Sequence, residues 1–243
     1  MKDRADKLLV SLGHFDSRAG ARAAIEAGRV TANGVTVAKP SQMLSSEDVI
    51  LAEAAHPYVS RGGLKLAHAL EAFGVDPAGR HCLDIGASTG GFTDVLLRAG
   101  AAHVTAIDVG REQLHASLRG HPRVTSLEAQ DARTLTAAML PAPPSLLVCD
   151  ASFIGLEKLL DVPLGLAAAG ADLVGLFKPQ FQVGRAHVGK GGLVTDAAAT
   201  ERAADAFAEW MNEKGWPIHA WTASPISGGD GNAERLFHAV RAQ

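Results

Sequence analysis

Cysteine is scarce in this chain, and a long hydrophobic run is missing. Its two cysteines among 243 residues, Cys82 and Cys149, lie in apolar stretches typical of strands, and no CxxC pair or Cys/His cluster has zinc spacing. This usage predicts buried, reduced thiols and no metal site. The longest stretch without Asp, Glu, Lys or Arg, from Thr134 to Cys149, is broken by prolines. No segment therefore offers the roughly 18 apolar residues of a membrane span. With no secretory signal visible at its start, we expect a cytoplasmic protein that does not enter a membrane.

A strong excess of charge of either sign is also missing. The formal net charge is −3, with 47% hydrophobic and 20% charged residues. This balance argues against a protein that coats nucleic acid by bulk charge, although it is compatible with a local basic patch. The composition is that of an ordinary globular protein, and the length suits one large domain, or one large and one small domain.

The first fifty residues differ in pattern from the rest. Residues 4–15 and 17–28 have helical periodicity, with Ser17 as an N-cap and Gly28 as the stop of the second helix. The Asn33-Gly34 pair that follows stands between β-branched residues, which predicts a tight hairpin.

A further strand is expected at residues 48–53. We expect a small α+β domain over residues 1–54, a linker over 55–60 and a second domain over 61–243.

The N-terminal region carries a modest positive charge. Seven basic and four acidic side chains up to Pro40 leave a surplus of three positive charges. A cationic face of this kind could hold RNA phosphates, or it could be an ordinary solvated surface. The candidates for RNA contact are Arg4, Arg18, Arg22, Arg29 and Lys39.

The stretch SRAGARAAIEAGRVTANGVTVAKPSQML resembles the αL-type RNA-binding domain of a small-subunit ribosomal protein, bacterial tyrosyl-tRNA synthetases and pseudouridine synthases. The resemblance rests on a helix followed in order by Gly28, Val30, Asn33-Gly34 and Lys39-Pro40. It departs from the family at Ala19-Gly20, where charged helix formers are usual. The resemblance favours RNA binding, with Arg18 and Arg22 left to make the contact.

From residue 61 onward, strand-like and helical segments alternate. A helix is expected over 62–74, and strands are expected over residues 81–86, 103–109, 123–129, 145–152 and 171–178. This alternation predicts an α/β fold, a Rossmann-like, doubly wound and mostly parallel sheet with helices on both faces.

The loop after the first of these strands, GASTGG, predicts a nucleoside-binding site. Its pattern, from Gly86 to Gly91, is neither the G-x-G-x-x-G of dinucleotide folds nor a phosphate loop. Asp108 ends the next strand about 20 positions later, where an acid hydrogen-bonds ribose hydroxyls. A nucleoside without a pyrophosphate suggests S-adenosylmethionine, although a lone glycine turn can also be a simple connection. The cofactor candidates are Asp84, Gly86, Ser88, Gly90, Gly91, Asp108 and Asp131.

A second glycine-rich segment, GRAHVGKG from Gly184 to Gly191, fits G-x-x-x-x-G-K. Its final position, Gly191, has no hydroxyl for a metal, and no clean strand-loop-helix pattern surrounds the segment. We expect a mobile substrate loop here and no nucleotide site.

Four charged residues stand at the ends of predicted elements around the same crevice. Asp150 and Lys178 each follow an apolar strand, Lys65 lies on the helix before the first strand, and Glu234 stands near the C-terminus. Methyl transfer from a sulfonium to a hydroxyl needs in-line positioning and help for the hydroxyl in losing its proton, which a lysine can supply. Surface ion pairs are the alternative for any one of the four.

The motifs YVSRGGLKL, CLDIGASTGGFTD, VCDASFI, LFKPQFQVGR and VGKGGLV resemble the TlyA family of ribosomal RNA methyltransferases, long labelled haemolysins. The catalytic domain of that family is similar to FtsJ-type RNA 2'-O-methyltransferases. The resemblance implies Lys65, Asp150, Lys178 and Glu234 as a catalytic tetrad, with Lys178 as the base. It further implies that Gly86, Gly90 and Gly91 line the methionine part of the cofactor, Asp108 the ribose and Asp131 the adenine.

The leading hypothesis is therefore S-adenosylmethionine-dependent 2'-O-methylation of a ribose, by resemblance a cytidine, in ribosomal RNA or a ribosomal subunit. The short ends of the chain resemble members that act on the large subunit alone. The alternatives are a non-catalytic RNA-binding ribosome assembly factor and a membrane-lytic haemolysin. The intact tetrad disfavours the first, and the lack of an apolar span disfavours the second.

Overall fold

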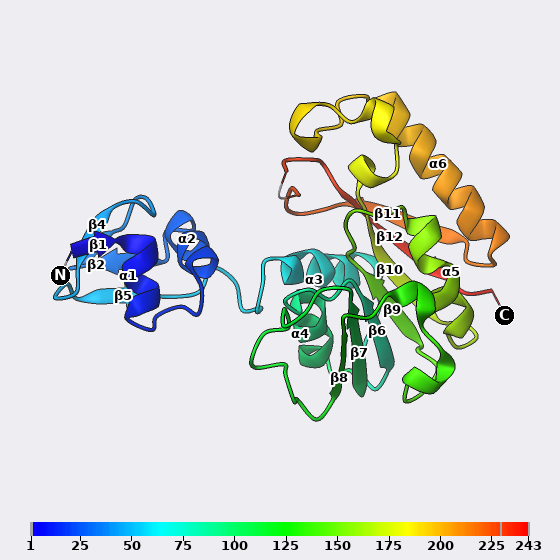
Figure 1. The fold of residues 1–243 in the computed structure, drawn as a ribbon, viewed down its shortest axis with the longest axis horizontal. Coiled ribbons are helices and arrows are strands. Elements are labelled where there is room, and N and C mark those ends of the chain that lie inside the picture. Colours follow the sequence, from blue (N-terminus) through cyan, green and yellow to red (C-terminus); the bar gives the residue numbers. More distant parts are fainter. Residues whose placement is uncertain (1, 229, 243) are drawn as a thin grey trace. The chain divides into compact units, whose positions relative to one another are not determined.

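The structure is a computed structural model that describes residues 2–228 and 230–242. The chain forms two compact units, the first ending at Ser60 and the second beginning at Arg61 (Figure 1).

The first unit contains two helices and two small sheets. The helices are α1 (Ala5–Ser11) and α2 (Arg18–Glu26), and the strands are β1 (Lys2–Arg4), β2 (Val30–Ala32), β3 (Val35–Thr36), β4 (Met43–Ser45) and β5 (Ile50–Ala52). Strand β1 pairs with β4, and the other three form a sheet in the order β3-β2-β5. Leu9, Ile25 and Val30 are buried in a shared core, so these short elements stabilise one another through tertiary packing.

Local signals in the sequence explain two of these elements. The Ser17 side chain accepts a hydrogen bond from Gly20 N at 3.2 Å and so caps α2, as predicted. Asn33 and Gly34 have φ angles of 52° and 79°, the positive values that a tight hairpin between β2 and β3 requires. Asn33 Nδ2 also donates to Asp48 Oδ1 at 2.9 Å, which fixes the hairpin against the segment before β5.

The second unit is built on a seven-stranded sheet with the order β11-β12-β10-β9-β6-β7-β8. The strands are β6 (His81–Ile85), β7 (His103–Asp108), β8 (Val124–Glu128), β9 (Leu146–Cys149), β10 (Asp172–Phe177), β11 (Ile218–Ala223) and β12 (Arg235–Val240). Strands β6 to β10 pair in parallel, whereas β12 is antiparallel to both of its neighbours. The predicted mostly parallel α/β sheet is confirmed.

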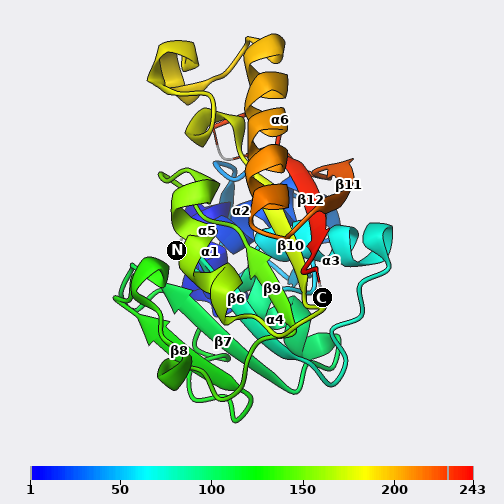
Figure 2. The same cartoon turned by 90° about the vertical axis from the view of Figure 1, so that its right-hand side faces the viewer.

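Helices cover both faces of this sheet (Figure 2). They are α3 (Gly62–Phe73), α4 (Gly91–Arg98), α5 (Leu156–Leu166) and α6 (Ala197–Glu213). Helices α3 and α4 contact each other on one face, while α5 and α6 contact each other on the opposite face. Apolar side chains such as Leu147, Phe177 and Phe237 are fully buried between these layers. Their removal from water is the main source of stability.

The sheet has a topological switch point between β6 and β9. From β6 the chain proceeds through β7 and β8 to one side, and from β9 it proceeds through β10 to the other. Ligands of doubly wound sheets bind at such a point, outside the carboxyl ends of the strands. The loops after β6, β7, β8, β9 and β10 are therefore where a site is expected.

The second glycine-rich segment does not form a phosphate loop. It contains two short 3-10 helices, at Arg185–His187 and Lys190–Gly192, between β10 and α6. A strand running directly into a helix N-terminus, which a phosphate loop needs, is not formed there.

Candidate active site

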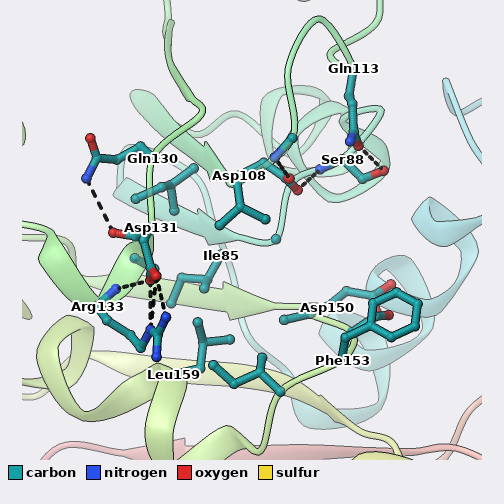
Figure 3. A pocket seen from close by; sticks show the side chains of 18 residues that line it. Ile85, Ser88, Asp108, Gln113, Gln130, Asp131, Arg133, Asp150, Phe153 and Leu159 are labelled. Atoms are coloured by element: carbon teal, nitrogen blue, oxygen red, sulfur yellow. Dashed lines mark hydrogen bonds and ion pairs between the residues drawn. The ribbon is translucent and has the colours of Figure 1, made fainter.

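A cavity of about 590 Å³ opens at the switch point (Figure 3). Its lining includes Gly86 after β6, Asp108 at the end of β7, Asp131 after β8, and Asp150 after β9. The volume is in the range of pockets that hold a small molecule. Four predicted site residues from four different loops therefore meet at one cavity.

Neighbouring protein atoms and the backbone conformation explain why two positions of the glycine loop require glycine. Gly86 has a φ of 81°, and a Cβ there would lie 3.0 Å from the backbone of Asp150 and Ala151. Gly90, at φ 92°, would direct a Cβ into the side chains of Leu114 and Leu118. Both positions therefore exclude side chains because of the loop conformation and of neighbouring protein atoms. Gly90 and Gly91 are buried, and they lie outside the lining of the cavity.

Asp108 is held rigidly at the cavity wall. Its Oδ1 accepts from Gly110 N at 2.7 Å and its Oδ2 accepts from Ser88 N at 2.8 Å (Figure 3). The Ser88 hydroxyl, predicted as a cofactor contact, donates to Gln113 Oε1 at 3.1 Å. A carboxylate fixed by two backbone N–H groups keeps further lone pairs for hydroxyl donors of a ligand.

Asp131 faces the same cavity together with a residue that the sequence did not single out. Arg133 Nη2 lies 2.6 Å from Asp131 Oδ2, and this hydrogen-bonded ion pair lowers the pKa of Asp131 (Figure 3). The Asp131 side chain also accepts from Arg133 N at 2.9 Å. The carboxylate therefore stays ionised and oriented at the end of the cavity beneath β8.

Asp84 lies behind the cavity wall and does not line it. Its side chain is completely buried, and its Oδ2 accepts from Thr93 Oγ1 at 2.6 Å. Among the described residues, no hydrogen-bond partner reaches its Oδ1. Burial is the main cause that raises the pKa of Asp84 to about 7. A direct contact with a cofactor thus stays a prediction for Asp84, as it does for Gly90 and Gly91.

The four charged residues expected to form a tetrad lie together beside the cavity. Lys178 Nζ is 2.6 Å from Asp150 Oδ1, and Lys65 Nζ is 2.6 Å from Glu234 Oε2 and 3.9 Å from Asp150 Oδ2. Asp150 therefore lies between the two lysines, with one carboxylate oxygen toward each. Lys65, Lys178 and Glu234 are buried, so these contacts are stronger than surface ion pairs, which are screened by water.

Ser152 and Phe153 complete this edge of the site, and sequence reasoning missed both. Lys178 Nζ donates to Ser152 Oγ at 2.8 Å. Phe153 is 92% exposed and has a φ of 68°, a strained conformation for a non-glycine residue. Its ring lies 5.3 Å from that of Phe181. The only available signal was their position directly after Asp150 in the DASF stretch.

The two cysteines are unsuited to nucleophilic chemistry. Cys82 and Cys149 are buried, and burial raises the pKa of each thiol to about 12. The thiolate, which is the reactive form, is therefore negligible near neutral pH.

The predicted RNA-contacting residues lie on the first unit and are exposed. Two of them share a buried partner: Arg4 Nε lies 3.0 Å from Asp6 Oδ1, and Arg18 Nη2 lies 2.7 Å from Asp6 Oδ2. The hydrogen bond from Arg4 is the main cause that lowers the pKa of Asp6 to about 2. Arg29 pairs with Glu53 at 3.4 Å, while Arg22 and Lys39 extend from the surface.

The structure also gives findings on metal binding and on membrane-spanning helices. Within residues 2–228 and 230–242, no group of three or more His, Cys, Asp or Glu side chains could hold a metal ion. In the same described part of the chain, no helix is long and apolar enough to cross a membrane.

Comparison with known families matches both units. Residues 58–241 match the FtsJ-like methyltransferase family, and residues 3–50 match the S4 domain. The second match is the RNA-binding domain that the N-terminal motif resembled.

Individual relatives extend over nearly the whole chain. The chain is 46% identical over 242 residues to the 16S/23S rRNA (cytidine-2'-O)-methyltransferase TlyA of Mycobacterium tuberculosis, covering 99% of this chain and 90% of the relative. It is 37% identical to the 23S rRNA (cytidine-2'-O)-methyltransferase TlyA of Campylobacter jejuni, covering 84% and 81%. A solved structure described as a candidate hemolysin from Streptococcus thermophilus is 36% identical with a TM-score of 0.79, covering 100% of this chain and 89% of that one.

Proposed function

The chain belongs to the TlyA-type members of the FtsJ-like methyltransferase family, and from this premise we propose that it transfers a methyl group from S-adenosylmethionine to a ribose 2'-hydroxyl of ribosomal RNA. The observation that carries the proposal is the cluster of Lys65, Asp150, Lys178 and Glu234 at the edge of the cavity. It provides a buried amine beside a space in which a nucleoside fits.

The residues around the cavity fit S-adenosylmethionine. Asp108 offers carboxylate lone pairs to ribose hydroxyls, and Asp131 offers an acceptor to the adenine amino group. Gly86 lines the cavity with its backbone, and the amino-acid part of the cofactor would lie against it. Asp84, Gly90 and Gly91 do not line the cavity, and their role would be to hold the glycine loop in its conformation. When bound, the cofactor supplies an electrophilic methyl group.

The charged cluster supplies what the acceptor hydroxyl needs. We assign Lys178 as the base that takes the hydroxyl proton, because its nitrogen lies within 2.6 Å of Asp150, a residue that lines the cavity. Asp150 places a negative charge beside this amine, and the Lys65–Glu234 pair holds Asp150 from the other side. The hydroxyl oxygen then forms its new bond to carbon, while the sulfur keeps the electron pair of the broken bond. Proton removal by a positioned base contributes roughly 100-fold to 10,000-fold to such a reaction.

The acceptor base also has a surface to contact. Phe153 lines the cavity and directly follows Ser152. Its exposed aromatic ring can stack an unpaired base. A ribose in a paired helix is poorly accessible, so the flanking ring favours a flipped-out or single-stranded nucleotide.

The substrate proposal rests on the relatives and on the S4 domain. Both named relatives act on cytidine of 23S rRNA, and one of them also acts on 16S rRNA. We therefore propose a cytidine in ribosomal RNA, with the large subunit favoured, because it is common to both. The S4 domain would deliver the RNA through Arg4, Arg18, Arg22, Arg29 and Lys39. Such an enzyme works where ribosomes are made, which places it in the cytoplasm under this proposal.

The competing functions make different demands on the molecule. A non-catalytic assembly factor would not need a buried amine at the cavity edge, so the cluster favours catalysis. The hemolysin name of some relatives finds no counterpart in the cavity, for which we propose a nucleoside ligand.

The decisive experiment incubates the protein with ribosomal subunits, or with 23S rRNA, and radiolabelled S-adenosylmethionine. The methylated nucleotide should resist alkaline cleavage on its 3' side, because its 2' oxygen can no longer attack the phosphate. Lys178→Ala should bind the cofactor with little change and lose at least about 100-fold in single-turnover rate.

Lys158→Ala, which changes an exposed lysine of α5, is the matched control and should keep the wild-type rate. An alkali-sensitive methylated product would exclude ribose methylation. RNA binding without any transfer to either substrate would favour the assembly factor.

A further inference from the structure

The Lys178 amine has two polar neighbours, of which one has no assigned role. The Lys178 nitrogen lies 2.6 Å from Asp150 Oδ1, but this ion pair does not have hydrogen-bond geometry, and within the described residues Asp150 Oδ1 has no hydrogen-bond partner. The same nitrogen donates a hydrogen bond to Ser152 Oγ at 2.8 Å. The Ser152 hydroxyl therefore gives the amine its direction, while Asp150 supplies a neighbouring negative charge.

Ser152 also connects this amine to the cavity, because Ser152 is one of the residues that line it. A hydrogen bond from Nζ to an acceptor restricts rotation about the Cε–Nζ bond, so the amine keeps one orientation relative to the cavity. Without the Ser152 hydroxyl, the ion pair with Asp150 alone would leave this rotation free.

Ser152 is itself fixed in place, unlike an ordinary exposed serine. The backbone of its neighbours Asp150 and Ala151 packs so closely on Gly86 that a Cβ there would be 3.0 Å away. On its other side Phe153 adopts a positive φ and lies 5.3 Å, ring to ring, from Phe181. Phe181 belongs to the 3-10 turn that directly follows Lys178. The Phe153–Phe181 contact thus packs the segment that carries Ser152 against the segment that carries Lys178.

We propose that Ser152 is a positioning residue of the methyl transfer, which holds the Lys178 amine in the orientation that accepts the proton of the 2'-hydroxyl. This inference rests on the proposed function. In the step concerned, the O–H bond of the hydroxyl breaks and its proton forms the third N–H bond of Lys178. Ser152 keeps its own proton and accepts a hydrogen bond from Lys178 both before and after the transfer.

The test compares Ser152→Ala with Ser152→Thr in the full-length protein. Ser152→Ala should lower kcat for RNA methylation by about tenfold or more, because misdirected reacting atoms are costly. The KM for RNA and the Kd for S-adenosylmethionine should change by less than about twofold, since under this inference Ser152 acts on Lys178 and on neither ligand. Ser152→Thr keeps the hydroxyl acceptor and should restore at least about half of the wild-type kcat.

Ser126→Ala removes an exposed serine from β8 of the same unit, and it serves as the matched control that should retain wild-type kcat. Wild-type kcat in Ser152→Ala would overturn the inference and leave the proposed function intact. An equal loss in Ser152→Ala and Ser152→Thr, or a loss of cofactor binding in both, would show a purely structural role and overturn it as well. Absence of transfer by the wild-type protein on subunits and on RNA would instead refute the proposed function.

Discussion

At the scale of single residues, Asp108 has two kinds of partner under the proposed function. Its two oxygens accept from Gly110 N and Ser88 N, and the ribose hydroxyls would add further hydrogen bonds. Asp108→Ala should weaken S-adenosylmethionine binding by about 1.5 to 3 kcal/mol, the value of a hydrogen bond to a charged group. The S-adenosylmethionine affinity of Asp108→Asn should lie between those of the wild type and of Asp108→Ala, because asparagine keeps one acceptor oxygen and loses the charge. Calorimetry measures both, and unchanged affinity in a folded variant would remove Asp108 from the site.

Asp84 gives a prediction about pH. Its pKa of about 7 in the folded protein, raised chiefly by burial, lies above the value of 3.8 of an exposed aspartate. Between these two values the unfolded chain loses a proton that the folded chain retains, so stability falls as the pH rises from about 4 to about 7. Asp84→Asn cannot ionise and escapes this loss.

The melting temperature of Asp84→Asn relative to the wild type should therefore rise between pH 4 and pH 8, with a change of at least roughly 3 °C for the second unit. Thermal denaturation across this range measures it, and Thr93→Val is a useful companion, because it removes the one hydroxyl that donates to Asp84. If the difference in melting temperature between Asp84→Asn and the wild type is the same at all pH values, Asp84 does not titrate as described.

Residues that end strands could be predicted from the sequence, whereas residues that act through a neighbour could not. Asp108, Asp150 and Lys178 each follow an apolar run, and parallel strands bring such positions to one edge of the sheet. Ser152 and Arg133 depend on where a loop turns after it leaves the strand. Because that direction is set by contacts such as the approach of Gly86 to Ala151, no periodicity in the sequence encodes it.

At the scale of elements, the glycine loop before α4 allows two reasons for a glycine to be tested separately: a positive φ and a lack of space for a side chain. Gly90 has a positive φ, and its space is also filled by Leu114 and Leu118. Gly120 has a φ of 70° with no heavy atom within 4 Å of an added Cβ. Gly90→Ala suffers strain and overlap together, whereas Gly120→Ala suffers strain alone. Gly90→Ala should thus lose about 1 to 3 kcal/mol more stability, the usual cost of overpacking.

Denaturant unfolding of the two glycine variants measures this difference, and cofactor affinity should fall in Gly90→Ala alone because only that loop borders the cavity. Equal destabilisation of Gly90→Ala and Gly120→Ala would mean that the leucine side chains move aside at no cost.

The sequence predicted the elements with strong local signals and missed those that depend on partners distant in the chain. Helix α2 has a cap and a stop, and β6 to β10 have apolar runs, so all of them were expected. Strands β1 and β4 have three residues each and exist through their pairing with each other. Strands β11 and β12 were also missed, because β12 inserts between β10 and β11 in reversed direction, an arrangement that the alternation of strands and helices does not indicate.

At the scale of the whole molecule, each unit has its own hydrophobic core and, under the proposed function, its own task. The core of the first unit contains Leu9 and Ile25, and that of the second contains Leu147 and Phe177. A fragment of residues 55–243, which keeps the predicted linker, should therefore fold and bind S-adenosylmethionine within about threefold of the full-length affinity, because independent domains retain their own cores. It should lose RNA affinity together with the basic side chains of the S4 domain.

The salt dependence of RNA binding tells whether those side chains act through charge. If the five proposed basic residues each contact a phosphate, the slope of log affinity against log salt should become shallower by about 4 in the fragment. The full-length double variant Arg18→Ala/Arg22→Ala should reduce the slope by about 1.5, while its cofactor affinity stays unchanged. An unchanged slope in both proteins, or full methylation of RNA by the fragment, would place RNA recognition on the methyltransferase unit. The S4 domain would then have a task other than delivering the substrate.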